Sequence, residues 1–161
     1  MKDATPLDIY RLLVRSVIKT NGIQRISNDS TSHAVVLTEE LIRSANASVD
    51  IYCHRLSSDV WGTVAVKAAV ESARQKIGMS FRVVVQEKSP ADIDASAFCF
   101  MKNSIRSYST ECLKTNFMII DKKAFRVEPD YSERKGFAYI NNSDMSGLLV
   151  NAFDSIYQTA V

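Results

Sequence analysis

The sequence of 161 residues is poor in the residue types on which several classes of site depend, with two histidines, three cysteines, five glycines and three prolines. An odd number of cysteines without Cys-x-x-Cys spacing argues against a secreted disulfide framework and indicates a reducing, cytoplasmic compartment. Cys53 and His54 are adjacent and would point to opposite faces of a strand, which predicts no zinc site. With so few glycines, the Gly-rich loops that bind nucleotide phosphates cannot form, and we expect no cofactor.

The sequence also has no large excess of charge and no long hydrophobic run. Its 20 basic and 18 acidic residues give a net charge of +2, which is too small to indicate nucleic acid, a membrane or an acidic substrate. No segment reaches the roughly 18 consecutive apolar residues of a membrane span. Near the N-terminus, Asp3, Asp8 and Arg11 interrupt the apolar stretch, so it does not read as a signal peptide. We therefore expect a cytoplasmic protein without a membrane partner.

What the sequence does contain predicts one domain over residues 1–161, to which a helix over 6–20 can be an accessory element. Thr5 and Pro6 are typical of the start of such a helix, and Asn21-Gly22 of its end. Further helices are expected at 34–45, 60–77, 89–105 and from 143 onward, with strands at 23–27, 48–54, 81–85, 117–120, 124–127 and 136–140. Alternating strands and helices followed by adjacent strands predict an α/β fold, with a mixed, largely parallel sheet between helix layers.

Two segments carry a family resemblance. Residues 40–52, ELIRSANASVDIY, form a predicted helix that leads into a strand, and residues 114–124, KTNFMIIDKKA, form a strand and a turn. Together with the order of elements, they resemble a single half-domain of the phospholipase D superfamily, whose catalytic strand carries the motif His-x-Lys-x4-Asp. The resemblance implies that this chain has that fold and that two copies, or one copy and another protein, pair around a shared site.

The motif is degenerate here. The resemblance places the family's nucleophilic histidine at Lys114 and its phosphate-binding lysine at Asn116, and only Asp121 is retained. The family's later Gly-Ser-x-Asn falls on Glu128–Tyr131. Its chemistry needs one imidazole to attack phosphorus and another to protonate the leaving group, whereas lysine, with a pKa of about 10.4, is mostly protonated near neutral pH. We therefore expect no catalytic residues and a lost activity.

A ligand pocket can remain where the family binds phosphate. If the fold is as expected, Lys114 and Asn116 lie near the end of the strand 48–54, where His54 and Arg55 follow, and Arg126 is a candidate neighbour on the next strand. The predicted pocket comprises these five residues and the retained motif residue Asp121. The competing interpretation is that Lys114 and Arg126 are solvated surface cations and that His54 is an ordinary strand-end residue.

Three functions are compatible with this sequence. The first is a non-catalytic binding or interaction module, a pseudoenzyme that binds a phosphate-containing ligand and works as a homodimer or with a protein partner. The second is an active phosphodiesterase or nuclease with a rearranged site that uses His54. The third is a nucleic-acid-binding accessory domain, for which salt-dependent binding would be diagnostic.

Overall fold

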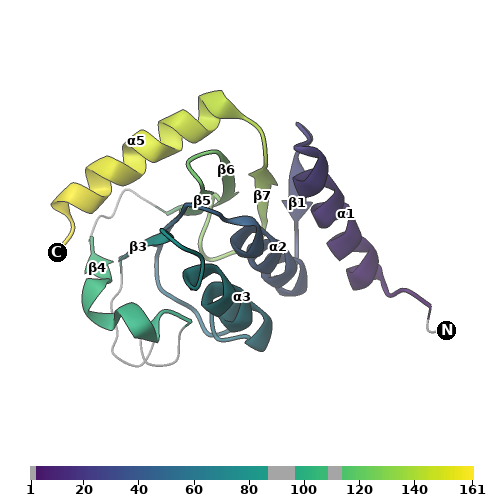
Figure 1. Ribbon diagram of the computed structural model, residues 1–161, viewed down its shortest axis with the longest axis horizontal. Helices are drawn as coiled ribbons and strands as arrows, with labels where there is room; N and C mark the ends of the chain where they lie inside the picture. The colour runs from purple at the N-terminus through teal and green to yellow at the C-terminus, as the bar shows by residue number, and fades with distance from the viewer. Residues whose placement is uncertain (1–2, 87–96, 109–113) are drawn as a thin grey trace.

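The computed structural model of the chain describes residues 3–86, 97–108 and 114–161, and its centre is one seven-stranded sheet (Figure 1). The strand order is β1-β7-β6-β5-β2-β3-β4. The strands are β1 (Ile26–Asn28), β2 (Ser48–Cys53), β3 (Ser80–Val85), β4 (Arg106–Ser107), β5 (Asn116–Ile120), β6 (Ala124–Glu128) and β7 (Gly136–Tyr139).

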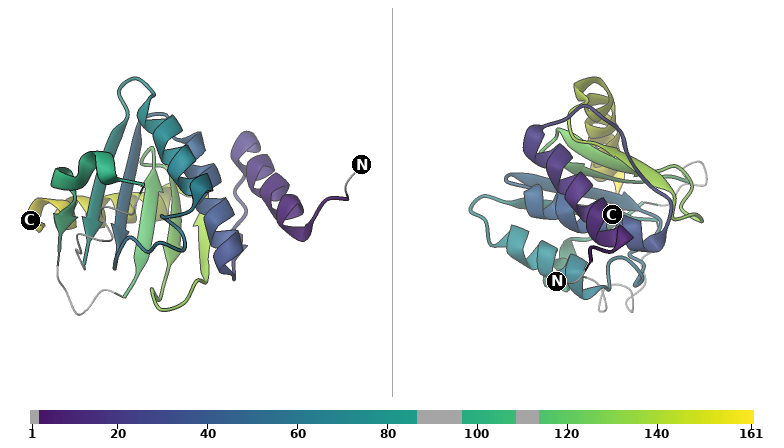
Figure 2. Two further views of the ribbon diagram at one scale, coloured as in Figure 1. Left: turned by 90° about the horizontal axis from the view of Figure 1, so that it is seen from below. Right: turned by 90° about the vertical axis from the view of Figure 1, so that its right-hand side faces the viewer.

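Helices cover both faces of the sheet. The helices are α1 (Pro6–Thr20), α2 (Thr31–Ser44), α3 (Val64–Arg74) and α5 (Ser143–Thr159), with a 3₁₀ helix η1 (Cys99–Ser104). Helices α2 and α3 pack side by side on one face, and α5 crosses the other (Figures 1 and 2). Helix α1 lies beyond the β1 edge and packs on α2.

Each face of the sheet has its own hydrophobic core, as the alternation along β2 predicts. Val49 and Ile51 contribute to the core under α2 and α3, whereas Tyr52 contributes to the core under α5, where Phe117 and Phe153 also lie. All five side chains are buried. The central position of β2, between β5 and β3, is therefore confirmed.

The α/β class and the mixed sheet are confirmed, but the expectation of a largely parallel sheet is wrong. Within the described residues, only the pairs β2–β3 and β3–β4 are parallel. The pairs β1–β7, β7–β6, β6–β5 and β5–β2 are antiparallel. The physical reason is chain connectivity, because β5, β6 and β7 follow one another through short loops that have no room for a crossover helix.

Two elements differ from the expected order. The predicted helix over 89–105 falls partly outside the described residues, and its described end is the 3₁₀ helix η1. The short strand β4 follows at once and pairs with β3, which the sequence pattern does not predict. At the N-terminus the capping signature is confirmed, since Thr5 Oγ1 accepts a hydrogen bond from the Asp8 amide and the Asp8 carboxylate accepts one from the Thr5 amide.

Candidate functional site

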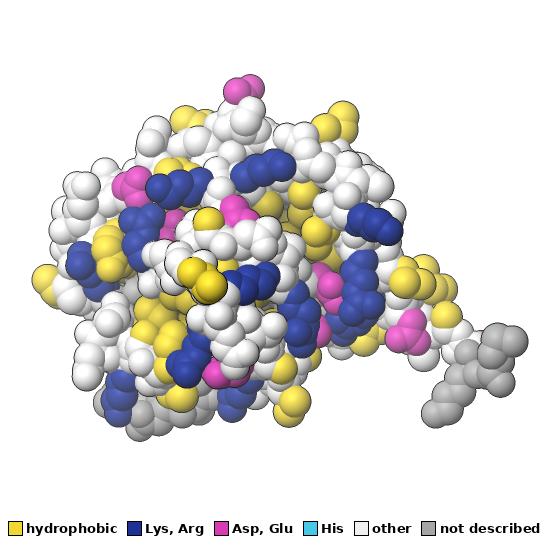
Figure 3. All heavy atoms as spheres, in the orientation of Figure 1, with side chains coloured by type: hydrophobic (Ala, Val, Ile, Leu, Met, Phe, Trp, Pro, Cys, Tyr) yellow, Lys and Arg dark blue, Asp and Glu magenta, His cyan; other side chains and the backbone are white. Residues whose placement is uncertain are grey.

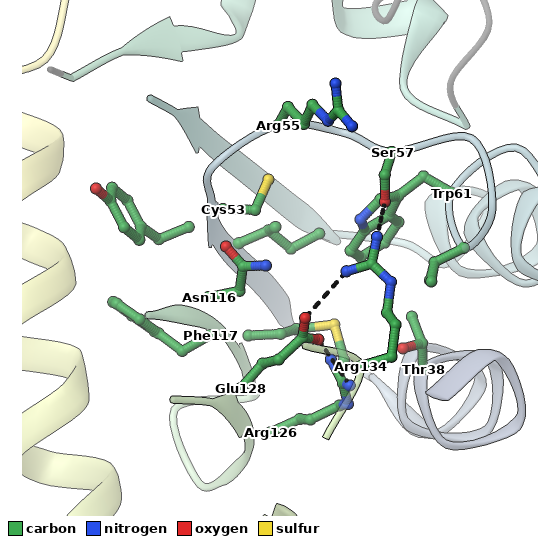
Figure 4. A pocket seen from close by; sticks show the side chains of 14 residues that line it. Thr38, Cys53, Arg55, Ser57, Trp61, Asn116, Phe117, Arg126, Glu128 and Arg134 are labelled. Carbon is green, nitrogen blue, oxygen red and sulfur yellow. Dashed lines mark hydrogen bonds and ion pairs between the residues drawn. The ribbon is translucent and has the colours of Figure 1, made fainter. Parts of the chain in front are cut away.

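An open pocket lies where β2 ends and β5 begins. Its volume is about 430 Å³, and it is bounded by the loop after β2 and the loop after β6. Eight residues line it: His54, Arg55, Ser57, Asp59, Asn116, Tyr131, Ser132 and Arg134. We call this the strand-end pocket. A narrow cavity of about 30 Å³ shares four of these residues and reaches into the core (Figure 4).

The histidine of the pocket is held by three neighbours. The backbone amide of His54 donates to Asn116 Oδ1 at 2.8 Å, and its ring Nδ1 lies 2.9 Å from Gln86 Oε1. The imidazole also stacks on Tyr131, with ring centroids 4.0 Å apart and an interplanar angle of 4°. This packing fixes the imidazole ring at the pocket wall. The side-chain carbonyl oxygen of Asn116 is occupied by the backbone amide of His54, the residue directly after β2.

Two cations remain available at this end of the sheet. Arg55 lines the pocket and is exposed, and Lys114, also exposed, lies two residues before the start of β5. The Lys114 carbonyl accepts a hydrogen bond of 2.8 Å from the Tyr131 amide, which places that lysine beside the pocket rim. Within the described part of the chain, neither side chain makes an ion pair. Hydrogen bonds from Ser132 lower the pKa of the nearby Asp130 carboxyl, and the charge of Lys114 adds to that effect. A guanidinium and an ammonium without an ion pair are groups that bind phosphate oxygens.

A third cation, Arg134, is already engaged by the protein itself. It donates to both carboxylate oxygens of Asp59 at 2.9 and 3.1 Å, to Ser57 Oγ at 2.8 Å and to Glu128 Oε1 at 3.0 Å. Burial lowers the pKa of Arg134, but the hydrogen bond to Asp59 and the charge of Glu128 outweigh it and raise that pKa. Figure 4 shows the hydrogen bonds of Arg134 to Ser57 and Glu128, with Arg55 apart from them.

Arg126 lies below the pocket and is not a surface cation. It is 9% exposed, and it donates to Asn28 Oδ1 at 3.1 Å and to Glu128 Oε2 at 3.0 Å. Burial lowers the pKa of Arg126, and the charge of Glu128 opposes that effect. Glu128, itself 2% exposed, thus bridges two guanidinium groups. The interpretation of Arg126 as a solvated cation is therefore wrong, because the β6 side chain turns into the core.

The retained motif aspartate lies at the opposite end of β5. Asp121 follows the last residue of the strand, in a turn where its own φ is 54° and that of Lys122 is 57°. Its carboxylate accepts hydrogen bonds from the backbone amides of Asn46, Ala47 and Ser48 at 2.7–3.1 Å. This contact fastens the β5–β6 turn to the start of β2 and leaves Asp121 away from the strand-end pocket.

The structure therefore brings together His54, Arg55 and Asn116 as pocket-lining residues, with Lys114 at the rim. It places Arg126 on the narrow cavity below and Asp121 at the far end of the strand. Sequence reasoning missed five other lining residues: Ser57, Asp59, Tyr131, Ser132 and Arg134. Tyr131 could have been found, since it occupies a position of the family's second motif, whereas the others lie in loops with no distinguishing pattern.

The described residues offer no alternative centre for metal chemistry. Among them, no three His, Cys, Asp or Glu side chains are grouped closely enough to hold a metal ion. The second histidine, His33, stacks on Tyr10 at 4.1 Å between α1 and α2 and does not line the pocket. None of the described helices has both the length and the apolar character needed to cross a membrane.

Solved structures share this architecture. Nuc from Salmonella typhimurium, a phospholipase D family member, aligns with a TM-score of 0.61 and 16% identity over 87% of this chain and 96% of its own. NucT from Helicobacter pylori aligns with a TM-score of 0.64 and 12% identity over 86% and 98%. TrmBL2, an archaeal chromatin protein with a novel mode of DNA binding, gives 0.61 and 12% over 92% and 58%.

These likenesses show a phospholipase D-like fold, which confirms the resemblance found in the two sequence segments. The match to TrmBL2 spans less than two thirds of that protein. No family model matches the chain, and no curated protein matches its sequence.

Proposed function

We propose that this chain is a non-catalytic binding module of phospholipase D-like fold that binds a phosphate-containing ligand in the strand-end pocket. The observation that carries the proposal is a pair of exposed cations that form no ion pair with another described residue, Arg55 in the wall of a pocket of about 430 Å³ and Lys114 beside it. The Ser57 and Ser132 side chains add hydroxyl groups to the same wall. A phosphate group bound there would accept hydrogen bonds from the guanidinium and the ammonium.

The residues at the motif positions support binding without cleavage. At the position of the family's nucleophilic histidine, Lys114 carries no imidazole that could attack phosphorus. At the position of the family's lysine, Asn116 carries no positive charge, and its Oδ1 accepts a hydrogen bond from the His54 amide. His54 is the one histidine that lines the pocket. A mechanism with a histidine nucleophile and a histidine acid is therefore not supported by one copy of the described site.

The proposal is tested by titrating the protein with inorganic phosphate and with a dinucleotide phosphodiester, followed by NMR at the pocket residues. We expect Arg55→Ala and Lys114→Ala each to weaken binding about tenfold, or about 1.4 kcal/mol. Lys67→Ala, which removes an exposed cation from α3, is the matched control and leaves the affinity unchanged. Equal affinities for all four proteins would contradict the proposed site.

An active phosphodiesterase is the second candidate, and the position of His54 in the pocket favours it. An assay without added metal, using a phosphodiester and a nucleic-acid substrate, separates the two candidates. We expect no turnover. Metal-independent cleavage that His54→Ala abolishes would overturn the non-catalytic proposal and show that His54 is required for the reaction.

Nucleic acid is the third candidate ligand, because one structural neighbour is a chromatin protein that binds DNA. Binding of this kind would weaken steeply as salt rises, since it would release counterions. Lys114→Ala would reduce the salt dependence, whereas Arg126 lies in the core and is unsuited to such a test. We propose further that the module works with a protein partner, in the first place a second copy of itself.

A further inference from the structure

The narrow cavity below the strand-end pocket has polar side chains from three parts of the fold in its wall. They are one residue of α2, two of β6 and one of the loop after β6: Thr38, Arg126, Glu128 and Arg134. The volume of the cavity is about 30 Å³. A space of this size holds a water molecule where the groups around it offer hydrogen bonds.

Thr38 is the member of this wall whose hydrogen bonding is incomplete. It is 1% exposed, and its Oγ1 makes no hydrogen bond with any residue that the structure describes. A threonine hydroxyl in a helix can donate to a carbonyl of the preceding turn, but that of Thr38 does not. In Figure 4 it points from α2 toward the side chains of Glu128 and Arg134. Because buried hydroxyl groups are normally hydrogen-bonded, this one indicates a partner inside the cavity.

The ion pair beside Thr38 has hydrogen-bonding capacity to spare. Arg126 donates to Asn28 through Nε and to Glu128 through Nη2, which leaves the hydrogens of its Nη1 for a further acceptor. Each carboxylate oxygen of Glu128 accepts one hydrogen bond, from Arg126 or from Arg134, and has a second lone pair. A molecule that both donates and accepts can therefore bind to Thr38 and to the ion pair at once.

The balance of charge around the cavity favours a neutral molecule over an anion. Figure 3 shows lysine and arginine side chains spread over one face of the molecule, where solvent surrounds them. Arg126 is buried instead, and its charge is matched by Glu128. Arg134 is matched by Asp59 and shares Glu128, so two positive charges face two negative ones. Arg55 also lines the cavity, but it is exposed and solvent screens its charge.

We propose that the narrow cavity is a binding site for one internal water molecule, held by Thr38, Arg126 and Glu128. The water accepts a hydrogen bond from the Arg126 guanidinium, donates one to the Glu128 carboxylate and shares one with Thr38 Oγ1. It thereby links α2 to β6 below the strand-end pocket. None of these three residues lines that pocket, so the water site does not depend on phosphate binding.

The sign of the stability change in Thr38→Val tests this site. If the hydroxyl holds a water, its replacement by a methyl group breaks the link and lowers stability. If the cavity is dry, the same change removes an unpaired buried hydroxyl and raises stability. We expect the equilibrium constant for unfolding in urea to rise about fivefold. Thr159→Val, at an exposed threonine near the end of α5, is the matched control and leaves that constant unchanged.

High-resolution crystal structures of the wild type and its variants locate the water directly. We expect a water oxygen within about 3.2 Å of Oγ1 in the wild type, retained in Thr38→Ser, which keeps the hydroxyl, and lost in Thr38→Val. A dry cavity in the wild type would overturn the proposal, and so would a Thr38→Val variant that is as stable as the wild type or more stable.

Crystals grown with bromide test the anion. An anomalous peak of bromide in the cavity would assign the site to a halide ion and overturn the water. The phosphate titration of the wild type is measured separately, and either proposal can fail while the other stands.

Discussion

The two ends of strand β5 differ in their surroundings. At its first residue, Asn116, the strand borders the open strand-end pocket, with the exposed cations Arg55 and Lys114 nearby. At its other end, both carboxylate oxygens of Asp121 accept hydrogen bonds from the backbone amides of Asn46, Ala47 and Ser48. The segment from Asn116 to Asp121 thus runs from the wall of an open pocket to a structural anchor.

This contrast between the two ends of β5 accounts for the match to the family pattern at Asp121 and for the departures from it at Lys114 and Asn116. The anchor needs a carboxylate, because two oxygens accept hydrogen bonds from three successive amides, and no neutral side chain offers the same acceptors. The pocket end has no such requirement on the fold. Lys114 and Asn116 can therefore differ from the residues of the family pattern without loss of the fold.

The largest effect is expected below the pocket end. Glu128→Ala leaves the buried guanidinium of Arg126 without its counter-charge and removes one partner of Arg134. Breaking a buried pair in this way costs about 3–5 kcal/mol, which urea unfolding measures. Glu133→Ala, at an exposed loop residue, is the control and changes stability by less than about 0.5 kcal/mol. A small loss for Glu128→Ala would show that the network is not needed for folding.

A smaller loss of stability is expected at the turn end. Asp121→Ala removes the acceptor of three backbone amides and should cost about 2 kcal/mol, while the affinity for phosphate stays unchanged. Urea unfolding and the phosphate titration measure the two effects separately. Lys123→Ala in the same turn is the control. Weaker phosphate binding at full stability would place Asp121 in the site and erase the contrast between the two ends.

Much of the fold could be predicted, because the alternation along β2 and the capping residues of α1 are local signals. The pairing of β5 with β2 was harder, since no local pattern states which strand a new hairpin will join. In the site, His54, Arg55 and Asn116 follow from the ends of strands. Arg134 and Asp59 could not be predicted, because they meet through loops 75 residues apart and their charges look like ordinary surface charges.

A third prediction concerns the effect of Asp59 on phosphate binding in the strand-end pocket. Asp59 accepts hydrogen bonds from Nε and Nη2 of Arg134, in the bidentate arrangement that a phosphate would adopt there. Asp59→Asn removes this negative charge from the pocket wall and should tighten phosphate binding severalfold, about 1 kcal/mol. Asp144→Asn, at an exposed acid of α5, is the control in the same titration. Unchanged or weaker binding by Asp59→Asn would mean that Arg134 does not take part in ligand binding.

The smallest effect is the acid sensitivity of the same contact. Partial burial works to raise the pKa of Asp59, but the hydrogen bond from Arg134 and its positive charge outweigh this and hold the pKa below its ordinary value of 3.8. A lowered folded-state pKa contributes stability that is fully present above 3.8 and is lost as the pH falls through the folded value. The advantage of the wild type over Asp59→Asn in urea unfolding should therefore be largest near neutral pH and shrink at about pH 3. If the advantage is the same at both pH values, the ion pair adds nothing to folding, and the pocket end of β5 is held by Glu128 alone.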